Sequence, residues 1–437
     1  MVLLKNFRNI FLIPELRKKL FFTLGVLIVS RLGTFIPVIG VNLPLLAEHM
    51  KRATSLGGLL GYLDIFSGGA LASATLFALG IGPYITASIM MQILGMAIPY
   101  LEQLVKEGEY GRKIINQYTR YLTVGLSIMY SSGMALYLEH QGLVLSPGWG
   151  FRLIFIISLT VGAMFVMWLG EQISLFGIGN GSSMLIFSGI VAKFPGYIIK
   201  TKALIDTGSF EMWQALLILV IFIAISACIV FLEKGERKIP VQYARRVVGQ
   251  RVYGGQSTYI PFKINTAGVM PVILASSMLQ FPLFAAGMLS QRFDFFRKFG
   301  EWFSPTSFLF NSFDFVLIIF FSFFYTALIF NPDELAENIK KSGGFIPGIR
   351  PGKKTAVFFN YILTRIGLVG ALYLALLSLA PNILNAFFRM PFYLSGTSLL
   401  IVVGVALETS AQIESYLIEH RYEGFLSTGR LKSRALR

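Results

Sequence analysis

The 437-residue sequence has few charged side chains, only three histidines and a single cysteine. Charged residues make up 14% of the chain and hydrophobic residues 55%, with a mean hydropathy of +0.68. A soluble domain of this length could not cover so much apolar surface, so the composition indicates a polytopic membrane protein. The lone Cys228 excludes a disulfide within the chain, and we expect it to be a small apolar core residue.

The scarcity of reactive side chains argues against catalysis. His49, His140 and His420 lie outside the apolar runs, so the serines of "GNGSS" (179–183) have no histidine at membrane depth. That stretch instead predicts a tight turn followed by an N-capping serine. "GFIPGIRPGKKT" (344–355) lacks the spacing of a phosphate-binding loop, and no Cys/His/Asp/Glu cluster has metal-ligand spacing. We therefore expect no enzymatic activity, no cofactor and no metal.

Several apolar runs are long enough to cross a bilayer, which takes roughly 20 residues in a helix. The runs are continuous rather than alternating, which favours helices over a β-barrel. We expect an all-α polytopic membrane protein whose ten transmembrane helices lie at about 20–38, 75–97, 118–138, 152–170, 183–201, 212–232, 265–287, 313–330, 364–381 and 395–413.

Lys and Arg concentrate on the side of the membrane that holds both termini, so the positive-inside rule predicts that both termini are cytoplasmic. The basic N-terminus, broken by Pro14, predicts a short surface helix rather than a cleavable signal peptide. Two loops on this side are strongly basic. Residues 233–263 hold seven basic and two acidic side chains, and residues 331–360 hold five and three. They suggest docking of a large anionic or acidic partner, or alternatively loops that set orientation and touch lipid headgroups.

An internal repeat relates the second and seventh predicted spans. Gly80–Gln92 reads "GIGPYITASIMMQ" and Gly268–Gln280 reads "GVMPVILASSMLQ", with seven of thirteen positions identical. The second and seventh spans are equivalent members of two five-span halves, and because five is odd the second half must be inverted relative to the first. The predicted halves are 1–205 and 206–437. The shared glycine and proline would let both helices bend or part.

Two function classes fit an inverted repeat: a coupled secondary transporter and a passive channel. A transporter usually carries ionisable residues in its broken helices, but residues 74–101 and 264–291 contain no charged side chain. An apolar constriction without fixed charge resists ions by dewetting, which favours the channel. The side chains available there are Ile81, Ile85 and Ile273, followed by the polar Ser88, Gln92, Ser276 and Gln280.

The sequence closely resembles a known family, the SecY family of bacterial protein-conducting channels, over essentially its whole length. The matching stretches are "FSGGALASATLFALGIGPYITASIMMQIL", "KEGEYGRKIINQYTR", "MWLGEQISLFGIGNGSS", "RRVVGQRVYGGQSTYIPFKINTAGVMP", "FNPDELAENIKKSGGFIPGIRPGKKT" and "FYLSGTSLLIVVGVALE". The resemblance implies two five-helix halves around a central hourglass pore, with a short plug helix, and passive passage of unfolded polypeptides.

The resemblance also implies which residues line the channel. The apolar pore ring would be Ile81, Ile85, Ile186, Ile273 and Ile401. The lateral gate, through which signal sequences reach lipid, would include Gly80, Pro83, Ser88, Gln92, Gly268, Pro271 and Gln280. Ser182 departs from a position that is often apolar in the family, which would loosen the seal on that side.

The plug would begin at roughly Leu59 and end at Ser73, as a short helix folded into the external funnel. Its residues include Asp64, Ile65, Phe66, Ser67, Gly68, Gly69 and Leu71. Small side chains would keep the segment slim enough to leave the funnel, while Asp64 stays hydrated.

The partners that the resemblance implies are the integral subunits SecE and SecG, signal sequences and nascent polypeptides, and the lipid bilayer of the bacterial inner membrane. The two basic loops would dock the SecA motor ATPase or the translating ribosome. The guanidinium groups of Arg245, Arg246, Arg251 and Arg350 suit bidentate pairing with carboxylate or phosphate.

Deleting residues 62–72 should leave export partly working but make the resting channel leak ions, because the deletion removes the plug from the funnel. Ion flux into vesicles that contain the purified protein measures the leak. A deletion variant as tight as the wild type would refute the plug assignment.

Overall fold

The computed structural model describes residues 13–46, 48, 69–70, 73–208, 210–243, 246–248, 251–253, 257–289, 303, 307–388 and 396–428. These residues fall into two compact units. One takes in the residues up to Phe194 together with those from Val405 onward, and the other takes in Pro195–Gly404. The division into halves 1–205 and 206–437 stays a prediction.

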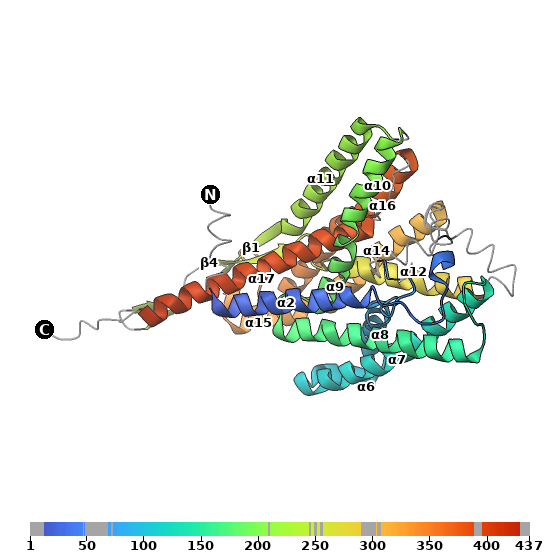
Figure 1. Cartoon of the computed structure of the whole chain (residues 1–437). Coiled ribbons are helices and arrows are strands. Elements are labelled where there is room, and N and C mark those ends of the chain that lie inside the picture. The colour runs from blue at the N-terminus through green and yellow to red at the C-terminus, as the bar shows by residue number, and fades with distance from the viewer. Residues whose placement is uncertain are drawn as a thin grey trace. The chain divides into compact units, whose positions relative to one another are not determined.

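The first unit is helical. Helix α7 packs against α5 and α8, and α2 packs against α8 (Figure 1). Helices α5 and α6 bend by 101° at a short break, where Pro99 starts α6. The helices are α2 (Pro14–Gly33), α5 (Gly82–Ala97), α6 (Pro99–Lys106), α7 (Glu109–His140), α8 (Trp149–Phe176) and α9 (Gly181–Val191).

Two glycines let other backbone segments of this unit lie directly against α8 and α9. A Cβ on Gly162 of α8 would stand 2.0 Å from the carbonyl oxygen of Leu76. A Cβ on Gly181, the first residue of α9, would stand 1.8 Å from the carbonyl oxygen of Gly170. Both spacings are too short for any side chain. The turn that precedes α5 therefore rests on the backbone of α8.

The second unit contains a run of packed helices and a small sheet. Helix α12 packs against α14, and α14 packs against α16. The helices are α10 (Phe194–Asp206), α11 (Met212–Lys234), α12 (Met270–Leu289), α14 (Phe308–Ile329), α15 (Pro332–Lys341), α16 (Lys353–Phe388) and α17 (Gly396–Thr428), whose residues from Val405 belong to the first unit.

The expectation that Cys228 is a core residue is wrong, because its side chain is exposed on α11. Only Ile218, Ile229 and Leu232 of this 23-residue helix are buried. A helix that is apolar on nearly every side but buried on so few positions offers its surface to lipid.

Part of the chain is a β-sheet, which corrects the all-α prediction. The loop at 233–263 forms strands β1 (Glu236–Tyr243) and β4 (Ser257–Lys263), which pair antiparallel. Strand β5 (Gly344–Phe345) of the second basic loop extends the sheet in the order β4-β1-β5. A separate short hairpin joins β2 (Arg246–Val248) to β3 (Arg251–Tyr253).

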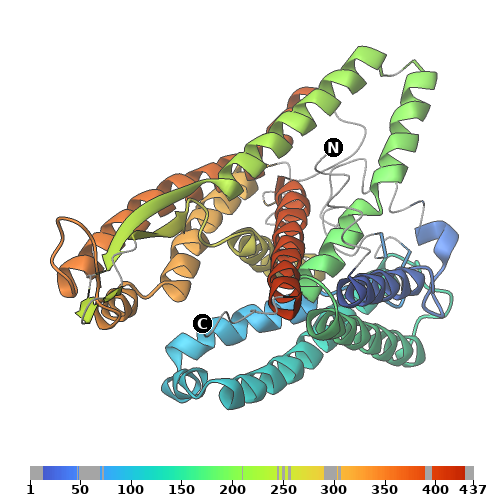
Figure 2. The same ribbon diagram turned by 90° about the vertical axis from the view of Figure 1, so that its left-hand side faces the viewer.

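The sheet forms because one face of β1 is apolar. Ile239 and Val241 are buried and alternate with exposed neighbours, which is the period-2 pattern of a half-buried strand. They pack in one core with Phe262 of β4, Ile339 of α15 and Phe359 of α16. Figure 2 shows this arrangement, with the long yellow-green strands beside the orange helices. The two basic loops are therefore one folded platform.

Each of the ten predicted membrane ranges overlaps a helix, although 20–38 runs past the end of α2 and 75–97 and 265–287 begin before α5 and α12. The helices overlapped are α2, α5, α7, α8, α9 with α10, α11, α12, α14, α16 and α17. Among the described residues, seven helical segments are long and apolar enough to cross a membrane, or eight if the bent α5–α6 pair is one span. The chain is thus mostly helical with several membrane-spanning segments, and the count of ten stays a prediction.

Candidate functional site

The two copies of the internal repeat begin their helices in the same way. Helix α5 starts at Gly82 and α12 at Met270, so Pro83 and Pro271 both stand in the first turn. Gly80 has φ +54° and Gly268 has φ +62°, a left-handed conformation that favours glycine.

This geometry corrects the expectation of helices that run on through the proline. The turns at 76–81 and 266–269 precede the helices instead of continuing them. The physical reason is that proline lacks an N–H and has a fixed φ, which suits the first turn of a helix, where N–H groups have no partner within the helix.

The first hydrogen bonds of both helices also match. The Ile85 N–H donates to the Ile81 carbonyl at 3.1 Å, and the Ile273 N–H donates to the Val269 carbonyl at 3.2 Å. Ile85 and Ile273 occupy equivalent positions of the repeat. The local backbone therefore sets the two isoleucines at the same distance from their helix starts.

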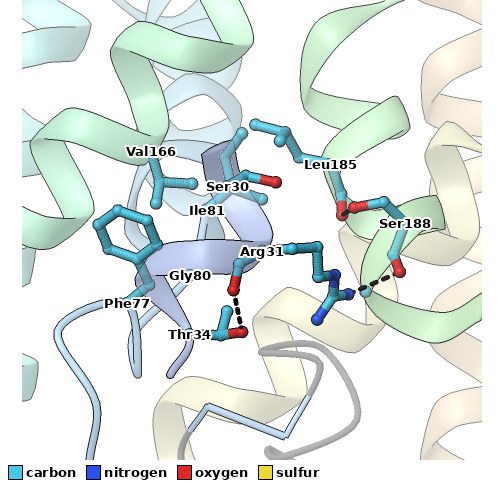
Figure 3. Close-up of a pocket in the computed structure, with 10 residues that line it drawn as sticks. Ser30, Arg31, Thr34, Phe77, Gly80, Ile81, Val166, Leu185 and Ser188 are labelled. Carbon is cyan, nitrogen blue, oxygen red and sulfur yellow. Dashed lines mark hydrogen bonds between the residues drawn. The ribbon is translucent and has the colours of Figure 1, made fainter. Parts of the chain in front are cut away.

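Ile81 lies beside a small cavity of about 40 Å³ in the first unit (Figure 3). Its side chain is 4% exposed, and a Cβ on Gly170 would stand 3.2 Å from Ile81 Cδ1 and 3.3 Å from Leu185 Cδ1. The cavity is large enough for water and has polar groups in its wall. Its lining residues are Ser30, Arg31, Thr34, Phe77, Gly80, Ile81, Val166, Leu185, Ser188 and Gly189.

Arg31 is a lining residue that sequence reasoning missed. Its guanidinium Nη2 donates to the Ser188 carbonyl of α9 at 2.6 Å, while the Thr34 hydroxyl donates to the Arg31 carbonyl at 2.7 Å (Figure 3). The available signal was an arginine inside the apolar run 20–38, since ionisable residues at membrane depth are rare and functional by default.

The other proposed ring residues are largely buried. Ile186 on α9 is 3% exposed and Ile85 on α5 is half-buried. In the second unit, Ile273 on α12 is 5% exposed and Ile401 on α17 is fully buried. Because Ile81, Ile85 and Ile186 belong to one unit and the other two to the second, the complete ring stays a prediction.

Within the second unit, the start of α12 packs directly on α17. A Cβ on Gly404 would stand 2.1 Å from Val269 Cγ2, a spacing that leaves no room for a side chain. Ile401 lies one turn before Gly404, and Ile273 one turn after Val269. The close approach therefore places the two ring candidates of this unit on neighbouring helix segments.

The polar gate residues lie in different environments. On α5, Ser88 is half-buried and Gln92 is exposed. On α12, Ser276 is buried and its hydroxyl donates to the Ile273 carbonyl at 2.9 Å. The side chain of Gln280 lies outside the described part of the structure, so the polar contact across the gate stays a prediction.

The start of α9 is capped by Asn180, so the prediction of an N-capping serine is wrong. The Asn180 Oδ1 accepts the backbone N–H groups of Ser182 at 3.1 Å and Ser183 at 3.4 Å. Asparagine precedes the serines and its side-chain oxygen reaches the second and third helical N–H groups. The Ser182 hydroxyl also donates to Asn180 Oδ1, at 2.6 Å, and its effect on the seal stays a prediction.

Most of the predicted plug lies outside the described residues, namely Asp64, Ile65, Phe66, Ser67, Gly68 and Leu71. Gly69 is described and has φ +97°, and a Cβ there would stand 3.7 Å from Lys193 Cε. The left-handed conformation explains why glycine occupies this position.

The proposed docking arginines lie on or beside the β platform. Arg246 and Arg251 belong to the β2–β3 hairpin, in which Arg251 pairs with Val248. Arg350 is exposed in the turn between β5 and α16, and its carbonyl accepts the Thr355 hydroxyl at 3.1 Å. Arg245 lies outside the described residues. Among those that are described, no group of His, Cys, Asp and Glu is arranged to hold a metal ion.

These features define a class, a multi-span helical membrane protein with matched helix breaks beside buried isoleucines. Residues 75–410 match the SecY family model. The SecY protein translocase subunit of Escherichia coli is 44% identical over 96% of this chain and 95% of its own length. This chain belongs to the SecY family.

Solved structures share the fold. One, described as showing that the plug domain of SecY stabilises the closed state of the translocation channel and maintains a membrane seal, has a TM-score of 0.65 and 18% identity over 95% of both chains. Sec61 in a canine ribosome-channel complex has a TM-score of 0.62 and 17% identity over 95% of both chains.

Replacing Gly80 by Ala should lower the free energy of unfolding by about 1–2 kcal/mol, because a side chain at positive φ is strained. Gly82→Ala is the matched control, since no atom lies within 4 Å of a Cβ there and its φ is not positive. Thermal unfolding in detergent compares the two variants. Equal unfolding temperatures would contradict a required break at Gly80.

Proposed function

We propose that this chain is the channel-forming subunit of a protein translocase. It is a passive pore for unfolded secretory polypeptides, and it opens sideways to release membrane segments into lipid. The observation that carries the proposal is the pair of matched helix starts, Gly80–Pro83 and Gly268–Pro271, each followed by an isoleucine at the same offset. Membership of a translocase family supports the same conclusion.

The proposed architecture has ten transmembrane helices in two inverted halves, 1–205 and 206–437, around an hourglass pore. The overlap of each of the ten predicted ranges with a helix supports the count. An odd number of spans per half and a shared backbone geometry at the repeat support the inversion.

The pore ring acts as a gasket around the moving chain. Branched apolar side chains recognise no particular sequence, so any unfolded polypeptide slides past them while ions stay poorly solvated. At rest the plug, from Leu59 to Ser73, fills the external funnel below the ring. The plug-domain description of the SecY structure similar to this chain supports that role.

Lateral release follows from the polarity of the gate helices. Ser88, Gln92 and Gln280 hold α5 and α12 together, each contact being worth about 0.6 kcal/mol in an apolar setting. An apolar signal sequence gains several tenths of a kcal/mol per Leu or Ile on entering lipid, which exceeds these contacts when summed over about 20 residues. The gate is therefore shut at rest and easily opened.

Energy comes from outside the chain. The β platform and its arginines dock the SecA motor ATPase or the translating ribosome, and the ribosome-bound Sec61 complex supports such docking. SecE and SecG are the integral partners. The complex lies in the bacterial inner membrane with both termini of this chain in the cytoplasm, the orientation that its basic loops favour.

Arg350→Glu should reduce motor-driven export at least tenfold, because it reverses an exposed charge at the docking surface while leaving the fold intact. Export of a precursor into inverted membrane vesicles measures the effect. Lys353→Glu, another exposed basic side chain three residues on, is the control for general charge loss. If assembly into the membrane falls as much as export, Arg350 is structural.

Photo-crosslinking probes at positions 81, 186 and 401 should each capture a stalled export substrate, because a polypeptide in the pore touches the whole ring. A probe at Ile223, 62% exposed on α11, is the lipid-facing control and should capture none. A coupled transporter of small solutes predicts no polypeptide crosslinks at any of these positions.

A further inference from the structure

Arg31 occupies an unusual position for a cation. It lies in the last turn of α2, inside an apolar run, and borders the same cavity as Ile81. A cationic side chain at membrane depth is costly unless protein groups or water solvate it. The proposed channel mechanism assigns no role to Arg31.

The guanidinium contacts the end of α9. Nη2 donates to the Ser188 carbonyl at 2.6 Å, and the same oxygen accepts the Ala192 N–H of the last helical turn at 3.1 Å. A cation at a helix C-terminus is favoured by the helix dipole, and a hydrogen bond from a charged donor is stronger than a neutral one. Ser188 lies two residues after the ring candidate Ile186.

Ile81 lines the same cavity (Figure 3), and a Cβ on Gly170 would stand 3.2 Å from its Cδ1 and 3.3 Å from Cδ1 of Leu185 on α9. The side chain of Arg31 therefore bridges α2 and α9 at the level where Ile81 meets α9. Apolar contacts alone would let α9 slide or rotate, because they have no direction, whereas a charge-assisted hydrogen bond fixes distance and orientation.

We propose that Arg31 is a positioning residue that holds α9, and with it Ile186, against α2 and Ile81, so that the constriction stays closed at rest. This inference rests on the proposed channel function. It assigns to the seal a polar tether in addition to the apolar ring and the plug.

The test measures iodide entry into vesicles that contain the complete purified complex and a halide-sensitive dye. Arg31→Met roughly keeps the length of the side chain but removes the hydrogen-bond donor. It should raise the resting leak about tenfold, because losing a hydrogen bond from a charged group changes an equilibrium by about that factor. Arg31→Lys should lie between wild type and Arg31→Met, because lysine keeps the charge but not the planar fork.

Ser30→Ala is the matched control. Ser30 borders the same cavity, but its hydroxyl donates to the Leu27 carbonyl within α2. It should leave the leak unchanged. An Arg31→Met channel as tight as the wild type would overturn the inference.

Chemical rescue separates positioning from general stability. Arg31→Ala opens space for a free guanidinium ion, and millimolar guanidinium chloride should restore the tight state, whereas tetramethylammonium chloride should not. A leak that guanidinium fails to reduce, together with a lower unfolding temperature, would mean that Arg31 only stabilises the fold. If the wild-type complex itself admits no polypeptide, the proposed channel function fails, independently of Arg31.

Discussion

The bilayer core offers no hydrogen-bond partners, so a helix in a channel wall is interrupted only where protein satisfies the freed backbone groups. The turn before α5 meets this requirement. The Leu76 N–H donates to the Ile36 carbonyl and the Gly80 N–H to the Phe77 carbonyl, each at 2.9 Å. Because these hydrogen bonds lie within the protein, the turn can end at Ile81 and the helix can begin at Gly82 without exposing these polar backbone groups to lipid.

The close packing around this break follows from the same constraint. The carbonyl of Leu76 lies so near Gly162 of α8 that only glycine fits, and Gly181 meets the carbonyl of Gly170 in the same way. Small residues therefore let backbone approach backbone, as is typical of helix packing in membranes. Ile81 is held in this close-packed region rather than on a free helix face, which makes it suitable as one wall of a constriction.

Much of the helical frame could be predicted because hydropathy is a local signal: twenty apolar residues in a row leave few alternatives. The equivalence of Ile85 and Ile273 can also be predicted from the sequence, because the internal repeat aligns the two residues. The sheet cannot be predicted in this way, because its strand pairing is not a local signal. Strand β1 pairs with β5 about a hundred residues further on, and the alternation of Ile239 and Val241 is too short to distinguish from a loop.

The hydrogen bonds that join distant helices cannot be predicted from the sequence either, because their partners are also far apart in the chain. The Arg31 guanidinium bonds a carbonyl 157 residues away, and the Ile178 N–H bonds the Thr23 hydroxyl across 155. In each bond one partner is a backbone group, the Ser188 carbonyl or the Ile178 N–H, so no pairing of side chains in the sequence marks the contact. An arginine in an apolar run signals that some partner exists but not which one. In the channel that we propose, the seal would therefore depend on two kinds of residue, apolar ones that the repeat reveals and polar ones that only the fold identifies.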